Sequence, residues 1–158
     1  MTGRTKLAAL FLTAAISASA ATAAGIDAKL WDGSWHLDAA ASKFSAAGKE
    51  QSETRTYSYS GGKLTMKSTS KDADGKQIDF TYSARLDGKW YPMKGNPRAD
   101  SIAVTAAGPR EVKANSRLHG KLTVKSVATV SADGKHLTLK RTYVGTKGSP
   151  TETLEFGR

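Results

Sequence analysis

Arg141 and Tyr143 are the residues of this chain whose types and spacing could hold a polar ligand group. They lie in a segment, 135–144, where alternation puts Arg141 on the same face as Leu137, Leu139 and Tyr143. A buried guanidinium is strongly unfavourable unless it is paired and hydrogen-bonded. The group that meets Arg141 is therefore a ligand or a charged or aromatic group of the protein itself, unless a shifted register puts Arg141 in water.

The same alternation of apolar and polar residues runs through most of the chain, and no segment after the first 24 residues sustains a helical spacing. Asx-Gly and Gly-Gly pairs, which suit tight hairpin turns, separate the alternating runs. The pattern predicts an all-β fold, an antiparallel up-and-down meander that closes into a barrel of eight to ten strands, and favours it over a sandwich. Strands are expected near 33–38, 51–60, 62–72, 76–86, 88–92, 101–107, 110–117, 121–131, 135–144 and 150–157.

Two segments interrupt the meander. Pro92, Gly95 and Pro97 predict an ordered loop at the barrel mouth, because proline fixes φ and removes a ladder donor. This loop would offer Met93, Lys94 and Arg98 to a ligand, or would simply be a corner of the chain. The segment Ala39 to Lys49 is expected to form a short helix or lid.

Aromatic and thioether side chains predominate on the inner face of the predicted barrel. A barrel of about eight strands has an interior that side chains just fill or that holds one small molecule. Inward positions that carry small residues, such as Ser68, Ala84, Ser126 and Ala128, favour an open cavity. The candidate cavity residues are Arg141, Tyr143, Tyr57, Tyr59, Met66, Phe80 and Tyr82.

Gly33-Ser34-Trp35 opens the first predicted strand, and this Gly-x-Trp resembles the N-terminal signature of lipocalin and fatty-acid-binding barrels. The resemblance implies that Trp35 closes one end of the barrel against Arg158 or Arg141. Arg141-Thr142-Tyr143 also resembles the Arg-x-Tyr pair with which fatty-acid-binding barrels hold a ligand carboxylate.

A longer resemblance rests on Trp35-His36-Leu37-Asp38, Asp87-Gly88-Lys89-Trp90-Tyr91-Pro92, Gly95-Asn96-Pro97 and Ser131-Ala132-Asp133-Gly134-Lys135. In these segments the chain is similar to small secreted bacterial proteins of unassigned activity that are described as lipocalin-like, of the calycin type. The disulfides of true lipocalins are absent. The resemblance implies a fold more than an activity.

Residues 1–24 have the order of a secretory signal peptide, with Arg4 and Lys6 ahead of the apolar run Leu7 to Ile16 and a small-residue tract up to Ala24. The apolar run is too short to span a bilayer, so no transmembrane segment is expected. The protein is predicted to be secreted or periplasmic, with one domain at 25–158. Cysteine is absent, and the net charge of +10 is scattered, without a nucleic-acid recognition motif.

Catalytic, cofactor and metal motifs are not found. The three histidines lie far apart, and the acid pairs Asp72 with Asp74 and Glu152 with Glu155 are expected at turns or on the outer face of strands. The leading hypothesis is an exported barrel that binds a small apolar or amphipathic molecule. Two alternatives remain open: an envelope protein-binding or inhibitor module whose basic face meets an acidic protein or the envelope surface, and a cofactor-free barrel enzyme of the isomerase or cyclase type.

Overall fold

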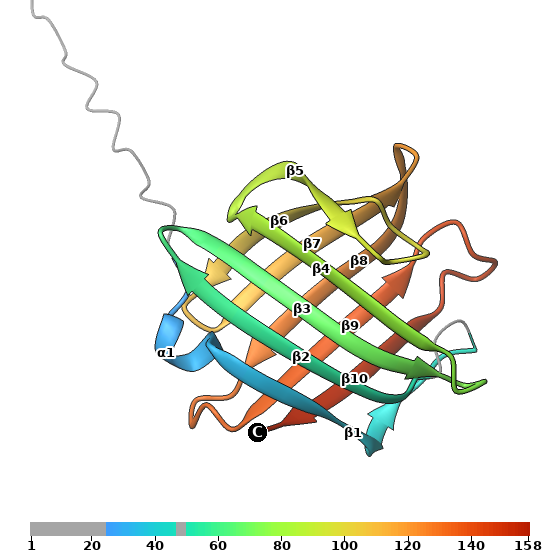
Figure 1. The fold of residues 1–158 in the computed structure, drawn as a ribbon, viewed down its shortest axis with the longest axis horizontal. Coiled ribbons are helices and arrows are strands. Elements are labelled where there is room, and N and C mark those ends of the chain that lie inside the picture. The colour runs from blue at the N-terminus through green and yellow to red at the C-terminus, as the bar shows by residue number, and fades with distance from the viewer. Residues whose placement is uncertain (1–24, 47–49) are drawn as a thin grey trace, which may run out of the picture.

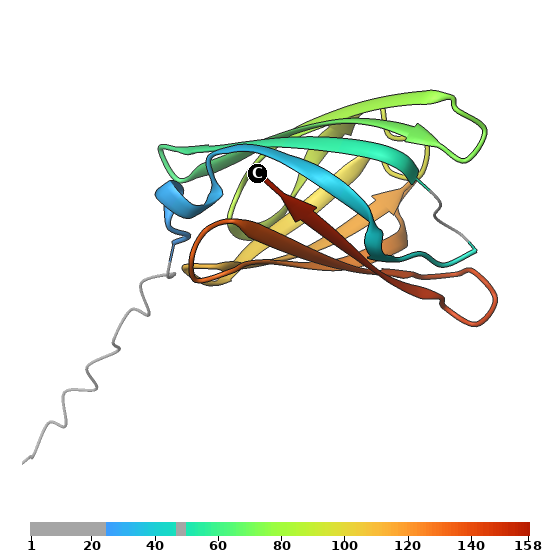
Figure 2. The same cartoon turned by 90° about the horizontal axis from the view of Figure 1, so that it is seen from below.

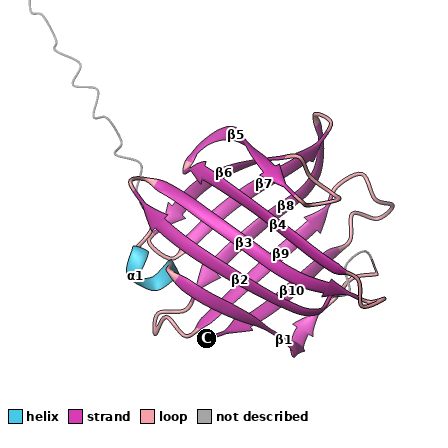
Figure 3. Cartoon of the chain, viewed as in Figure 1, coloured by secondary structure: helices cyan, strands magenta, loops and turns pink. Residues whose placement is uncertain are grey.

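A computed structural model describes residues 25–46 and 50–158, so the predicted signal peptide at 1–24 lies outside the described residues. Most of the described chain is strand, and the rest is loops and turns with very little helix (Figures 1 and 3). One short helix, α1 (Ala28–Trp31), precedes ten strands: β1 (Gly33–Lys43), β2 (Glu50–Ser60), β3 (Lys63–Asp72), β4 (Gln77–Arg85), β5 (Asp87–Lys94), β6 (Ser101–Gly108), β7 (Glu111–Leu118), β8 (Lys121–Val130), β9 (His136–Tyr143) and β10 (Thr151–Gly157).

The strands form a closed antiparallel meander in which each strand pairs with its neighbours in sequence. Pairing between β1 and β10, with Leu37 opposite Phe156, joins the first strand to the last and leaves the sheet without a free edge. Figure 2 shows the barrel from the side, with α1 at one end and the β3–β4 and β9–β10 connections at the other. The predicted all-β, up-and-down barrel is confirmed.

Glycine at positive φ allows most of the tight turns. Gly61 and Gly62 take φ values of 57° and 72° between β2 and β3, as a two-residue hairpin turn of the primed type requires. The Asx-Gly pattern predicts a hairpin turn at Asp87-Gly88, but both residues belong to β5. The register of β5 against β6 shifts between Asp87 and Trp90, so this pair lies in a β-bulge and not in a turn.

The helix expected within Ala39 to Lys49 is wrong for the described part of that segment. β1 continues to Lys43, with a register shift against β10 after Asp38. The Asp38 carboxylate accepts the backbone N–H groups of Ala40 and Ala41, which satisfies donors that the irregular strand leaves unpaired. Residues 47–49 lie outside the described residues.

The core lies inside the barrel, where alternate residues of the strands point inward. Leu64, Val104, Val130, Leu137 and Leu154 are completely buried. Serine and alanine share this inner face at Ser68, Ala84 and Ala128, as the alternation predicted. The interior therefore combines large aliphatic side chains with short ones that leave space.

Candidate functional site

One end of the barrel is closed by aromatic side chains from α1 and β1. Trp31 and Trp35 are fully buried, and the Trp35 indole N–H donates to the carbonyl of Trp31 at 3.2 Å. The Trp31 indole N–H donates in turn to the carbonyl of Pro109 in the β6–β7 turn at 3.1 Å. The structure brings Arg158, and not Arg141, over the Trp35 ring, with its guanidinium carbon 3.9 Å from the ring centroid.

Neither α1 nor the role of Trp31 follows from the alternation of residues in the sequence. Asp27, whose carboxylate accepts the Lys29 N–H, is an N-cap signal that the sequence does carry. The helix is a single turn, so it has no apolar periodicity to detect. Trp31 packs edge-on against Tyr57, with ring centroids 5.5 Å apart, and thus forms the floor of the interior.

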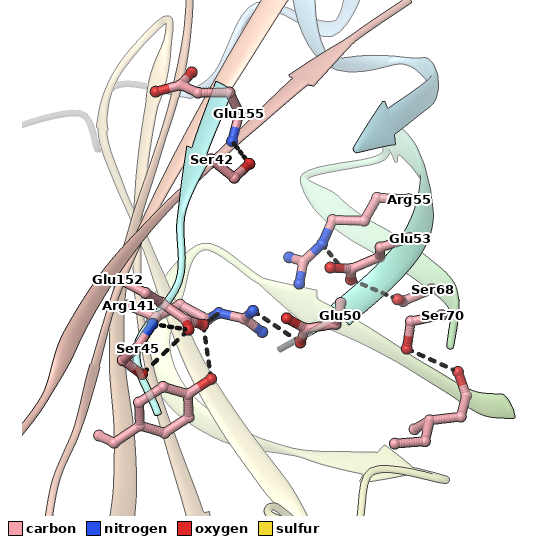
Figure 4. A network of polar contacts seen from close by, with 12 residues as sticks. Ser42, Ser45, Glu50, Glu53, Arg55, Ser68, Ser70, Arg141, Glu152 and Glu155 are labelled. Atoms are coloured by element: carbon pink, nitrogen blue, oxygen red, sulfur yellow. Dashed lines mark hydrogen bonds and ion pairs between the residues drawn. The ribbon is translucent and has the colours of Figure 1, made fainter. Parts of the chain in front are cut away.

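A buried ion pair lies above that floor on β2. Glu53, Arg55 and Tyr57 alternate on one face of the strand and all point inward. Arg55 Nε donates to Glu53 Oε1 at 2.7 Å, and Ser68 Oγ donates to the same oxygen at 2.7 Å (Figure 4). The Arg55 guanidinium carbon also lies 5.5 Å from the centroid of the Phe156 ring, within cation–π range.

A second ion cluster surrounds Arg141 on β9 (Figure 4). Arg141 Nη2 donates to Glu50 Oε1 at 2.9 Å, and Arg141 Nε forms an ion pair with Glu152 Oε1 at 2.7 Å. The Tyr143 hydroxyl donates to that Glu152 oxygen at 2.7 Å, and Ser45 donates to the other Glu152 oxygen through N and Oγ. The carboxylates that pair with Arg141 therefore belong to the protein itself.

The expected position of Glu152 on an outer face or at a turn is wrong. Glu152 is 1% exposed and lies directly opposite Arg141 in the β9–β10 ladder. The sequence held a signal for this, because Glu152, Leu154 and Phe156 share one face of the strand. Leu154 and Phe156 are buried, and alternation carries Glu152 inward with them.

Burial and charge shift the pKa values of these groups in definite directions. Burial raises the pKa of Glu53, but the attraction of Arg55 and Arg141 and the Ser68 hydrogen bond outweigh it, so that the pKa lies below its ordinary value. Burial lowers the pKa of Arg141, but the charges of Glu53, Tyr143 and Glu50 together outweigh it, so that the pKa lies above its ordinary value. Burial also raises the pKa values of Tyr82 and Tyr143. The two arginines and Glu53 are thus charged, and the phenols keep their protons.

A cavity of about 150 Å³ occupies the interior between Trp31 and the opposite end of the barrel. Apolar wall residues include Ile102, Val112 and Leu139. Six of the seven residues predicted for the cavity line it: Arg141, Tyr143, Tyr57, Met66, Phe80 and Tyr82.

Tyr59, the seventh, does not line the cavity. Its side chain points inward, as alternation requires, but lies at the closed end of the barrel. There its hydroxyl is beside Gly25, close enough that a Cβ on Gly25 would lie 3.1 Å away. Alternation therefore predicted the inward face of Tyr59 correctly, but it did not predict that Tyr59 lies nearer the closed end than the cavity does.

The predicted loop at the mouth lies between β5 and β6. Asn96, Pro97, Arg98 and Ala99 line the cavity, and Ala99 is buried. The Arg98 guanidinium carbon lies 5.0 Å from the centroid of the Tyr143 ring, and the Arg98 carbonyl accepts the Thr123 hydroxyl at 2.9 Å. The loop thus covers part of the open end of the barrel.

The three residues predicted from this loop have different positions. Met93, on β5, is buried and lines the cavity, as does Arg98. Lys94 is exposed and is not part of the lining. It follows Met93 in the strand, so its side chain leaves on the opposite face.

No model of a known protein family matches the chain, and no curated protein matches it. A closed antiparallel barrel of ten strands is compatible with a calycin-like fold. Within residues 25–46 and 50–158, no three histidine, aspartate or glutamate side chains come together as a metal site. Nor does this part of the chain contain a helix of the length and apolarity needed to cross a bilayer.

Proposed function

We propose that this chain is an exported lipocalin-like protein that binds a small apolar or amphipathic molecule inside its barrel. The observation that carries this proposal is the cavity of about 150 Å³, lined by apolar and aromatic side chains together with charged and polar ones, among them Arg55 and Arg141. Such a lining is typical of small-molecule sites. Burial of apolar ligand surface supplies about 25 cal/mol per Å².

The size of the cavity limits the ligand. An apolar cavity of about 150 Å³ holds benzene in another protein. We therefore expect a compound with a single ring or a short chain, and a long-chain fatty acid would need the mouth loop to move. The ion pairs of Arg141 with Glu50 and Glu152 also argue against a simple carboxylate clamp at Arg141 and Tyr143.

The export part of the proposal depends on the order of residues in the first 24 positions. Cleavage after Ala23 or Ala24 would leave a mature chain that begins at Ala24 or Gly25. Intact-mass measurement of the protein from the culture medium or the periplasm of an expressing bacterium tests this. Recovery of the uncleaved chain from the cytoplasm alone would overturn the export proposal.

Ligand binding is tested by native mass spectrometry of the exported protein, followed by NMR titration with benzene or toluene. The Ala128→Leu variant fills part of the cavity, because Ala128 lines it. Lys140→Leu is the matched control, since Lys140 is on the exposed face. Binding that survives in Lys140→Leu and is lost in Ala128→Leu would support the proposal, and equal binding by the two variants would overturn it.

A further inference from the structure

The cavity wall presents hydrogen-bond donors that have no acceptor. Arg55 uses Nε on Glu53 and has Nη1 3.5 Å from the Tyr57 hydroxyl, while Nη2 meets no acceptor in the described part of the chain. Arg141 donates through Nη2 to Glu50, and its Nε contacts Glu152 as an ion pair without a hydrogen bond. Its Nη1 likewise has no partner among residues 25–46 and 50–158. The Tyr82 hydroxyl is a third such donor, and all three side chains line the cavity.

The carboxylate oxygens are less available than these donors. Glu53 and Glu152 are buried behind the lining and are not part of the cavity wall. Glu50 is part of the wall, and its Oε1 accepts from Arg141. Its Oε2 and the Oε2 of Glu53 accept no hydrogen bond in the described part of the chain, but both atoms are buried away from the cavity surface. A ligand that enters the cavity therefore meets N–H and O–H groups before it meets carboxylate oxygens.

The charge balance of the interior disfavours a further anion. The guanidinium groups of Arg55, Arg98 and Arg141 line the cavity, and four carboxylates, those of Glu50, Asp72, Glu53 and Glu152, line it or lie behind its wall. Glu50, Glu53 and Glu152 each accept from an arginine or a hydroxyl group (Figure 4). Asp72 accepts from two backbone N–H groups. An anionic ligand would add a negative charge to an interior that already carries an excess of one, at short range and in a low dielectric.

We propose that the occupant of the cavity is a small neutral molecule with a carbonyl-type oxygen, such as a ketone, amide or lactone, that accepts from Tyr82, Arg55 or Arg141. This inference rests on the proposed function, because it specifies the ligand of the same cavity. A neutral acceptor satisfies the unpaired donors without adding charge. Its apolar part would lie against Met66, Ile102 and Leu139.

Four probes of similar size separate the ligand classes. Cyclohexanone has the carbonyl acceptor, and methylenecyclohexane has the same shape without it. Cyclopentanecarboxylate is the anion, and cyclohexylammonium is the cation. Dissociation constants are measured by NMR titration of the mature protein. We expect cyclohexanone to bind about threefold to tenfold more tightly than methylenecyclohexane, as one hydrogen bond provides, and more tightly than either ion.

Tyr82→Phe removes one unpaired donor and keeps the ring. It should weaken cyclohexanone binding about threefold to tenfold and leave methylenecyclohexane binding unchanged. Tyr59→Phe is the matched control, because the same hydroxyl is removed outside the cavity. It should change neither constant. Thermal unfolding of both variants shows whether the fold is retained.

The outcomes distinguish the ligand class from the function. Equal affinity for cyclohexanone and methylenecyclohexane, or tightest binding of either ion, would overturn the neutral-acceptor inference while leaving a binding cavity. A Tyr82→Phe effect that is equal for the ketone and the hydrocarbon would overturn it as well. Failure of all four probes and of benzene to bind would overturn the proposed function and this inference with it.

Discussion

Arg158 stacks on Trp35 at the closed end of the barrel, with 3.9 Å between the guanidinium carbon and the ring centroid. The same guanidinium donates to the carbonyl of Asp32 at 3.1 Å and to the carbonyl of Leu30. Leu30 belongs to α1, and Asp32 connects α1 to β1. One side chain that follows β10 therefore fixes the helix and the first strand at the seam where the barrel closes.

Replacing Arg158 should loosen this end of the barrel. Arg158→Ala removes a cation–π contact and two hydrogen bonds, so we expect the free energy of unfolding to fall by about 1–3 kcal/mol. Urea unfolding followed by tryptophan fluorescence measures it. Arg110→Ala is the control, because Arg110 is exposed and its side chain has no polar contact in the described structure. Equal stability of the two variants would show that the stack contributes nothing.

Most strands could be predicted because their apolar and polar residues alternate. In β3, Leu64, Met66 and Ser68 are buried between exposed or half-buried neighbours, and glycine pairs mark the hairpin before it. Local chemistry of this kind determines both the fold class and the inward face of each strand. The barrel and most of its cavity wall follow from that alternation.

The ion clusters could be predicted in part. Glu152 lies opposite Arg141 because of the register of the β9–β10 hairpin, which is a local feature. The pairing was not predicted because acidic side chains usually face water. The contact between Arg141 and Glu50 joins residues 91 positions apart and depends on barrel closure, which no local pattern reveals. Likewise, Tyr59 has the right face, but its height relative to the cavity depends on how α1 closes the end.

Removing Arg141 should be strongly destabilising. Arg141→Met keeps an apolar stem but leaves Glu152 and Glu50 without their cation. Breaking a buried ion pair from one side costs about 3–5 kcal/mol. Lys140→Met, on the exposed face of the same strand, should change stability by about 0.5 kcal/mol or less. Urea unfolding of both variants at neutral pH is the measurement, and similar losses for the two would refute an ionic role for Arg141 in the fold.

Stability should fall in acid, partly through Glu53. The pKa of Glu53 in the folded protein lies below its ordinary value of 4.5, because Arg55, Arg141 and Ser68 favour the charged form despite burial. The Glu53 carboxylate therefore makes its full contribution to the free energy of unfolding above pH 4.5. That contribution is lost as the pH falls through the lower pKa of the folded state. The free energy of unfolding should decrease between about pH 5 and about pH 3.

Glu53→Gln isolates that contribution. The variant should be less stable than the wild-type protein at neutral pH, and its stability should depend less on pH in the acid range. Asp87, Asp100 and Asp133 also have lowered pKa values, chiefly from hydrogen bonds, so part of the slope should remain. Glu111→Gln is the control, because Glu111 pairs loosely with Lys113 at the surface. The interpretation fails if Glu53→Gln and the wild-type protein have the same acid slope.

Gly95 should prove essential to the mouth loop for two separable reasons. Its φ of +82° disfavours any side chain, and a Cβ there would collide with the carbonyl oxygen of Asp79 on β4. Gly120 has a similar φ of +78° with open space around it, so Gly120→Ala measures the backbone effect alone, about 1–2 kcal/mol. Gly95→Ala should cost about 1–3 kcal/mol more, from overpacking.

Gly95→Ala should also weaken cyclohexanone binding, because Asn96 and Ala99 of the same loop line the cavity, whereas Gly120→Ala should not. Urea unfolding and NMR titration compare the two variants, and equal effects would mean that the loop does not depend on its close approach to β4.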